Sequence, residues 1–306
     1  MNNVTISHRL QESRKNFISS WLASHLANSN QKSFVVGVSG GVDSALVSTL
    51  CVETQLPVHL VTLPIGGEPD PKALAHMEWL KQKAEMLKQD RKTKTADDDG
   101  PLIHLSANVT SHIYDLSNSF NAFRKDLDLI DEDSLSPTIH QHLVSTRSLV
   151  LANLQSRMRM SALYAVANAH RGLVVGTGNK IEDQGIGFFT KGGDGMVDLS
   201  PIGDMMKSEV MELARYMGVS YDIVDAAPTD GLWEDGRTDE DQIGATYDEL
   251  EWAMKETYPE SFEKTVVKTP SPARRDDIMA LFTKRHHANR HKMEMPPVCW
   301  RVCLKE

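Results

Sequence analysis

The sequence predicts an α/β fold, a doubly wound parallel sheet flanked by helices. Short apolar runs alternate along the chain with longer segments of helical periodicity, which is typical of parallel strands joined by right-handed crossovers. The first apolar run ends in a glycine pair, Gly40–Gly41, and a helical pattern follows at once. Ligands of such sheets bind at the carboxyl ends of the strands, so we expect the site in the loops there.

The first quarter of the chain contains a helix, a strand, a second helix and a second strand. Residues 5–29 place apolar side chains at helical spacing and predict an amphipathic helix. Residues 34–38 predict a buried strand, and residues 43–53 predict the helix that follows the glycine turn. A second strand is expected at 58–63, where Pro64 ends it.

The middle of the chain predicts two helices, a short strand and a segment without clear periodicity. We expect a helix at 71–87 and a third strand at 102–105. Residues 119–145 mix polar and apolar side chains without a period and predict a flexible excursion. Residues 147–170 are strongly helical, and Gly172 is expected to stop that helix.

The last part begins with a fourth strand at 173–175. A glycine-rich loop is expected at 185–204, and a helix at 207–217 that ends at Gly218. The tail after residue 270 is basic and predicts partly irregular structure. We find no internal repeat and expect one domain over residues 1–306.

Composition narrows the class of protein. The chain has 306 residues, 40% hydrophobic and 25% charged, which is ordinary for a globular protein. Its net charge of -9 argues against a nucleic-acid partner, since polyanions usually meet basic surfaces. No apolar run approaches the ~18 residues of a membrane span, and the polar N-terminus does not resemble a signal peptide. Three cysteines without a CxxC pair favour reduced thiols and a cytoplasmic location.

The loop at 39–44 contains groups suited to binding an anion and a cation. Gly40 and Gly41 allow a tight turn whose backbone amides suit an anion at a helix N-terminus. Ser39 and Ser44 add hydroxyl donors. The carboxylate of Asp43 would repel phosphate directly, so its presence indicates a bridging cation, most simply Mg²⁺. The alternative is a simple glycine turn with a capping side chain.

These residues match SGGxDS, the pyrophosphate loop of ATP pyrophosphatases, a superfamily that includes several synthetases and tRNA thiolation enzymes. Three later stretches, GTGNK at 176–180, FFTKGGDG at 188–195 and PTDGLW at 228–233, occur in an order that resembles the NAD synthetase family. The resemblance runs from about residue 30 to the His291–Lys292 pair. It implies a Rossmann-like fold, ATP as cosubstrate, Mg²⁺, and a homodimer with its dinucleotide site at the subunit interface.

The resemblance also implies roles for individual residues. The ATP-binding residues would be Gly37, Val38, Ser39, Gly40, Gly41, Val42, Asp43, Ser44, Thr177, Lys207 and Thr229. The residues that bind deamido-NAD would be Arg157, Lys191, Asp198, His291 and Lys292. Asp43 and Glu182 would hold Mg²⁺, and the catalytic set would be Asp194, Lys207 and Thr229, with Asp194 near the incoming ammonia.

The implied activity is adenylation of the nicotinate carboxylate of deamido-NAD by ATP, loss of pyrophosphate, and attack by ammonia to give NAD and AMP. The residue types suit it, because Mg²⁺ and a lysine can screen the charge of a triphosphate and an acid. Each residue also has a plainer interpretation: Arg157 and Arg159 as a solvated helix face, Lys207 as a surface lysine, Asp194 as a turn residue.

The sequence departs from the NAD synthetase pattern at two places, and two alternative functions are considered. Thr62 stands where many members have an arginine, and one extra residue lies between GTGNK and FFTK. The loop begins at residue 37, so we expect no amidase domain and ammonia as the direct nitrogen donor. A tRNA-modifying enzyme would need a basic surface and a catalytic cysteine or zinc pairs. A non-catalytic ATP-binding module would not need Asp43, Glu182 and Lys207 together.

Overall fold

A four-stranded, fully parallel sheet forms the centre of the computed structural model, with strand order β3-β2-β1-β4. The strands are β1 (Ser33–Gly37), β2 (Val58–Thr62), β3 (Val109–Ile113) and β4 (Gly172–Val175). The chain moves outward from β1 to β3 and then returns to place β4 on the other side of β1. The doubly wound α/β fold is thereby confirmed, with its switch point between β1 and β4.

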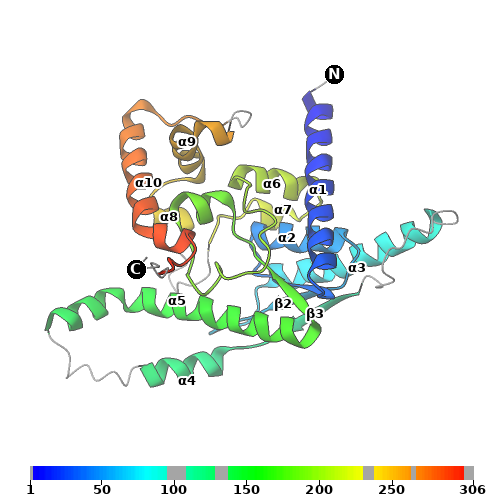
Figure 1. The fold of residues 1–306 in the computed structure, drawn as a ribbon, viewed down its shortest axis with the longest axis horizontal. Coiled ribbons are helices and arrows are strands. Elements are labelled where there is room, and N and C mark those ends of the chain that lie inside the picture. The colour runs from blue at the N-terminus through cyan, green and yellow to red at the C-terminus, as the bar shows by residue number, and fades with distance from the viewer. Residues whose placement is uncertain (1–2, 95–107, 128–136, 230–237, 263–266, 300–306) are drawn as a thin grey trace, which may run out of the picture.

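Helices cover both faces of this sheet (Figure 1). One face packs against α1 (Asn3–Asn28), α2 (Val42–Glu53), α3 (Pro71–Lys94) and α6 (Lys207–Tyr216). The other face packs against α5 (Pro137–His170), which α4 (Ser117–Leu127) accompanies. Because side chains alternate along a strand, Val36 and Leu60 enter the first core while Val35 and Val61 enter the second.

A third hydrophobic cluster joins the later helices beyond the carboxyl end of the sheet. It is formed by residues of η2 (Ile181–Ile186), α9 (Tyr247–Thr257) and α10 (Pro272–Met293). Short turns complete this part of the chain: α7 (Tyr221–Val224), α8 (Asp239–Ile243) and η3 (Pro259–Phe262). The prediction of a partly irregular tail after residue 270 is wrong over α10, because Ile278 and Phe282 bury one side of a regular helix.

The structure describes residues 3–94, 108–127, 137–229, 238–262 and 267–299. The expected strand at 102–105 lies outside these ranges, and the strand that pairs with β2 is β3. The expected excursion at 119–145 is wrong where it overlaps α4 and α5, which are regular helices. Among the residues that the structure describes, every helix is too short or too polar to span a bilayer.

Two details differ from a simple reading of the sequence: the residue that ends α5 and the buried face of α1. Arg171, not Gly172, ends α5 in the left-handed conformation, with φ of 52°. Gly172 instead lets β4 approach β1, since a Cβ there would lie 2.8 Å from Val35 Cγ2. On α1 the buried face contains Ile18, Leu22 and Leu26, whereas the apolar Phe17 points to solvent.

Candidate functional site

The glycine loop connects β1 to α2 at the carboxyl edge of the sheet. Gly40 has φ of +90°, a conformation that favours glycine, and a Cβ there would lie 2.8 Å from Asp70 Oδ2. Ser44 Oγ donates to the Gly41 carbonyl at 3.0 Å and lies 3.1 Å from Ser39 Oγ. Gly41 is the N-cap of α2 and has no side chain to cap the first amides, so an anion can take that place.

Two acidic residues and one lysine meet beside this loop. Lys207 Nζ lies 2.6 Å from Asp43 Oδ2 and 3.1 Å from Glu182 Oε1. The three come from the first turn of α2, from η2 after β4, and from the first residue of α6. Lys207 is 3% exposed, so its interpretation as a surface lysine is wrong. Two carboxylates on one ammonium leave the cluster one negative charge in excess.

The environment shifts the protonation of this cluster. Burial raises the pKa of Asp43, although Lys207 opposes the shift. Burial lowers the pKa of Lys207, but the attraction of Asp43 and Glu182 outweighs burial and raises it above the usual value. Asp183 has a pKa raised to about 8 by burial and by the charges of its neighbours, chiefly Glu182. Excess negative charge in a buried place is the setting in which a cation binds.

Two residues that sequence reasoning missed position the acidic pair. Asn179 Nδ2 donates to Asp43 Oδ1 at 3.2 Å, and Asn179 Oδ1 accepts from the Glu182 amide at 3.1 Å. Tyr247 donates to Glu182 Oε1 at 2.6 Å, and its ring centroid lies 4.8 Å from Lys207 Nζ. Asn179 belongs to the GTGNK motif and could have been suspected, whereas Tyr247 opens α9 and has no local signal.

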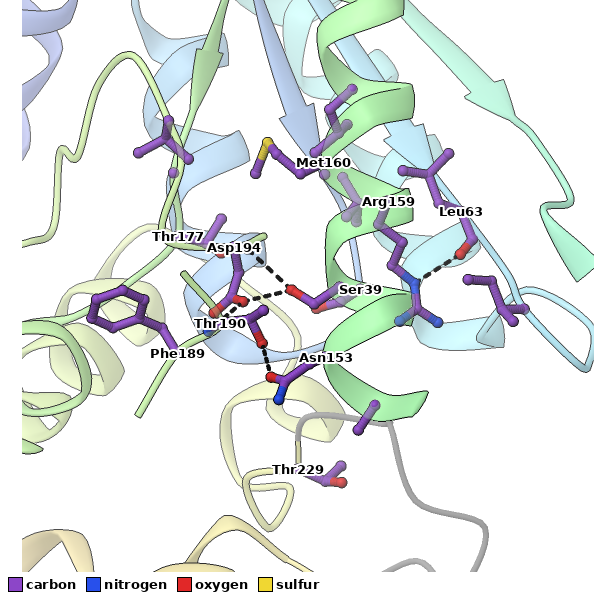
Figure 2. Close-up of a pocket in the computed structure, with 18 of the residues that line it drawn as sticks. Ser39, Leu63, Asn153, Arg159, Met160, Thr177, Phe189, Thr190, Asp194 and Thr229 are labelled. Carbon is purple, nitrogen blue, oxygen red and sulfur yellow. Dashed lines mark hydrogen bonds between the residues drawn. The ribbon is translucent and has the colours of Figure 1, made fainter. Parts of the chain in front are cut away.

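A pocket of about 740 Å³ opens at the same edge of the sheet. Its walls include these candidate residues: Gly37, Val38, Ser39, Thr177, Asp194, Thr229 and Lys292. Figure 2 shows Asp194, Thr190 and Asn153 together on one side, and Arg159 reaching toward Leu63 on the other. A cavity of this size can enclose most of a nucleotide-sized ligand.

Asp194 is held at the pocket wall by three hydrogen bonds. Its Oδ1 accepts from Ser156 Oγ at 2.6 Å and from the Thr190 amide at 3.0 Å. Its own amide donates to Ser156 Oγ at 3.1 Å. Desolvation raises the pKa of the Asp194 carboxyl, and these donors only partly offset it. Asp194 is therefore a positioned carboxylate, more than a residue that merely completes a turn.

The residues expected to bind the dinucleotide form a chain of contacts beside the pocket. Arg157 Nε donates to the Lys191 carbonyl at 3.2 Å, and Lys191 Nζ donates to the His291 carbonyl at 2.6 Å. Lys292 Nζ donates to the carbonyls of Gly187 and Phe189 at 2.6 and 2.8 Å. Hydrogen bonds from lysine side chains to backbone carbonyls thus join the FFTK segment to the end of α10.

Asp198 differs from the others in its contacts. Its Oδ2 accepts from the Val174 amide at 2.8 Å, and its Oδ1 accepts from Tyr164 at 3.2 Å. These bonds tie the segment after FFTKGGDG to β4 and α5. Asp198 therefore has a structural role at the sheet. Of the five residues expected to bind the dinucleotide, Lys292 lines the pocket described above, and the other four are not among its lining residues.

Comparison with known proteins places the chain among NAD synthases. The family model for NAD synthase matches residues 15–296. The NH(3)-dependent NAD(+) synthetase of Methanococcoides burtonii is 32% identical over 287 residues, which is 94% of each chain. The chain belongs to the NAD synthase family. The family assignment confirms the resemblance drawn from the motifs.

Two solved structures resemble this family member in fold. NMN synthetase from Francisella tularensis has a TM-score of 0.68 and 27% identity, over 94% of this chain and 98% of its own. NH3-dependent NAD synthetase from Campylobacter jejuni has a TM-score of 0.59 and 24% identity, over 98% of this chain and 100% of its own. The second likeness supports the fold alone.

The two expected departures have structural counterparts. The segment between GTGNK and FFTK, where we expect one extra residue, forms the π-helix η2. Near Thr62, Arg159 Nε donates to the Leu63 carbonyl at 3.0 Å and lines the pocket. The interpretation of Arg159 as part of a solvated face is therefore wrong, and this arginine supplies positive charge close to Thr62.

Proposed function

We propose that this protein is an ammonia-dependent NAD synthetase that makes NAD from deamido-NAD, ATP and ammonia. The nicotinate carboxylate attacks the α-phosphorus of ATP and pyrophosphate leaves. Ammonia then attacks the acyl carbon, AMP leaves, and one proton is released. The observation that carries the proposal is the meeting of the glycine loop with Asp43, Glu182 and Lys207 beside the pocket that contains Asp194.

The glycine loop is proposed to bind the pyrophosphate portion of ATP. Its amides lie at the start of α2, where backbone dipoles favour an anion. Ser39 and Ser44 already bond the loop to itself, so the turn is organised before the ligand arrives. Thr177 and Thr229 add polar side chains along the pocket wall, where we assign them to ATP.

Asp43 and Glu182 are the proposed Mg²⁺ ligands. The residues fit, because both carboxylates reach one ammonium and are close enough to share a single hard cation. Mg²⁺, when bound there, would screen the charge of the triphosphate and of the leaving pyrophosphate. Lys207 keeps its charge beside the carboxylates and is assigned to the phosphates. Asn179 and Tyr247 hold the carboxylates in place.

Asp194 is proposed to orient ammonia and accept its proton. Ser156 and Thr190 both donate to Oδ1 and so fix the carboxylate at the wall of the pocket. A carboxyl with a raised pKa is a better base than an ordinary aspartate. Arg157, Lys191, Asp198, His291 and Lys292 are proposed to bind the dinucleotide, and the contacts between the FFTK segment and α10 support a shared surface.

The deciding assay combines purified protein with ATP, Mg²⁺, ammonium and deamido-NAD. NAD and AMP should appear in equal amounts, and a reaction without either product would refute the proposal. Glutamine in place of ammonium should give little NAD if ammonia is the direct donor. Asp43→Asn should abolish turnover, and an unchanged rate would remove the metal role from this residue.

A mononucleotide substrate is the second candidate. The Francisella structure, described as an NMN synthetase, has a TM-score of 0.68 against 0.59 for the Campylobacter NAD synthetase. Amidation of a nicotinate mononucleotide needs the same chemistry at the carboxylate and differs only in the remote part of the substrate. Comparison of kcat/KM for deamido-NAD with kcat/KM for nicotinate mononucleotide decides between them, because the preferred substrate has the larger value.

We further propose a single NAD synthetase domain, a homodimer and a cytoplasmic location. The family match over residues 15–296 supports the first. Exposed apolar side chains at Phe123 on α4 and at Leu149 and Val150 on α5 support a subunit interface on this side. A mass of one chain by light scattering at micromolar concentration would contradict the dimer.

A further inference from the structure

Three histidines from distant parts of the chain gather on the α5 face of the sheet. His59 belongs to β2, His112 to β3, and His170 is the last residue of α5. Each offers one ring nitrogen, and these three nitrogens all lie within 4.8 Å of one another. Figure 1 shows the C-terminal end of α5 beside β2 and β3. His59 and His170 lie toward the amino ends of the strands, away from the glycine loop.

The two strand histidines are spaced like ligands of one ion. His59 Nδ1 and His112 Nε2 are 3.3 Å apart. In a tetrahedral site with metal–nitrogen bonds of about 2.0–2.1 Å, two ligand nitrogens are roughly 3.3–3.4 Å apart. The pairing register sets this spacing, because His59 lies opposite Thr110 and His112 is two residues further along the same face.

Thr110 contacts both strand histidines. Its Oγ1 lies 2.7 Å from His59 Nδ1 and 3.0 Å from His112 Nε2. One hydroxyl proton can serve only one of these nitrogens, so the other contact is made either by a ring N–H or by a cation. A cation between the nitrogens would satisfy both rings at once.

His170 supplies the third nitrogen from an exposed position. Its ring stacks on that of His59, with centroids 3.9 Å apart and planes 30° apart. A metal lies in the plane of each ring that ligates it, so His170 must turn about its side-chain torsions to complete the site. The exposure of His170 leaves room for this rotation.

The surroundings keep the strand histidines in the form that binds metals. Burial, and then the nearby rings of His170 and His112, lower the pKa of His59 to about 4. Burial also lowers the pKa of His112. Neutral imidazole is the ligand form, and imidazole suits Zn²⁺, Ni²⁺ or Cu²⁺ better than Mg²⁺, which prefers oxygen.

We propose that His59, His112 and His170 bind one divalent transition-metal ion, with Zn²⁺ as the reference ion. The ion ties the edge strand β3 and the end of α5 to β2, and water or Thr110 completes its shell. The site is separate from the Asp43–Glu182 pair and does not depend on the proposed reaction. Such an ion stabilises the fold because it binds the native arrangement of three elements that are far apart in the unfolded chain.

The test titrates Zn²⁺ and then Co²⁺ into full-length protein freed of metal, with millimolar Mg²⁺ present to occupy the carboxylate pair. One equivalent of Zn²⁺ should bind and raise Tm, and Co²⁺ should give the visible absorption of a four-coordinate site with nitrogen ligands. His170→Ala should weaken Zn²⁺ binding at least about tenfold, since even residues behind the ligands cost 10–100-fold when changed. His287→Ala, an exposed histidine on α10, is the matched control and should leave the affinity unchanged.

His170→Ala is chosen because its side chain is exposed, and its Tm in chelator should equal that of the wild type. His112→Ala provides a second variant at a partly buried ligand and should also lose the cobalt absorption. Absence of a one-equivalent Zn²⁺ site in the wild type overturns the proposal. Equal Zn²⁺ affinity in the wild type, His170→Ala and His112→Ala also overturns it, since the ion would then sit elsewhere on the surface.

Discussion

Removal of the Lys207 charge by Lys207→Met should destabilise the protein strongly in the absence of divalent metal. The lysine side chain is 4% exposed, and those of Asp43 and Glu182 are 17% and 16% exposed. At an effective dielectric of about 20, each contact of ~3 Å supplies roughly 5–6 kcal/mol of gross attraction. Desolvation offsets much of this, and removal of one partner from a buried pair costs about 3–5 kcal/mol.

The measurement is the free energy of unfolding in urea with a chelator present. Lys81→Met is the matched control, because Lys81 is 42% exposed and lies 3.5 Å from the exposed Glu78. It should change stability by less than about 0.5 kcal/mol. The double variant Asp43→Asn/Lys207→Met should recover part of the loss, since it removes one of the two unpaired charges.

Millimolar Mg²⁺ should also recover stability in Lys207→Met, because the cation replaces the missing positive charge between Asp43 and Glu182. The reasoning fails if Lys207→Met is no less stable than Lys81→Met in chelator. It also fails if the double variant is destabilised by the full sum of its two single changes, which would mean that the two charges do not interact.

Four further outcomes follow from the same site. Tyr247→Phe removes the donor to Glu182 and should raise the Mg²⁺ concentration for half-maximal rate by roughly tenfold, and an unchanged Mg²⁺ dependence would contradict it. Asp194→Asn should slow NAD formation by about 10²–10⁴-fold while exchange of labelled pyrophosphate into ATP continues; equal loss of both would place Asp194 in the first step. In the wild type the rate should fall as pH drops through the raised pKa of Asp194, because the protonated form cannot accept a proton. Asp183 has a folded pKa of about 8, so it favours the folded state at low pH and this contribution is lost as pH rises toward 8. Between pH 5 and 8 the free energy of unfolding of the wild type should therefore fall by up to about 1.4 kcal/mol per pH unit because of Asp183, and Asp183→Asn, measured in chelator, should lack this fall. Parallel pH profiles of variant and wild type would show that Asp183 is not the cause.

Local patterns explain what could be predicted from the sequence. The glycine loop, GTGNK and FFTKGGDG are contiguous, and each follows or lies near a strand, so their positions at the carboxyl edge follow from the α/β alternation. The inward residues of α6, such as Val210 and Leu213, are regular enough to be predicted and are fully buried. β3 was missed because its pattern, VTSHI, contains polar side chains on an edge strand.

The missed helices have a different cause. In α10 most side chains are charged or polar, and the helix is stabilised by Ile278 and Phe282 in a cluster with η2 and α9. The apolar partners come from η2 and α9, outside the helix itself, so periodicity within α10 alone could not reveal them. The same is true of Arg159, whose partner is the end of a strand 96 residues earlier.

Short-range residue order is enough to predict the family, the doubly wound class, the loop that suits an anion and the acids expected near a cation. Three features appear only in the folded chain: Lys207 is buried between Asp43 and Glu182, Tyr247 donates to Glu182, and three histidines from distant segments lie together. The partners are far apart in sequence, up to 164 residues for Lys207 and Asp43. Their contacts follow from the strand order and from the packing of the helices, which no local pattern encodes.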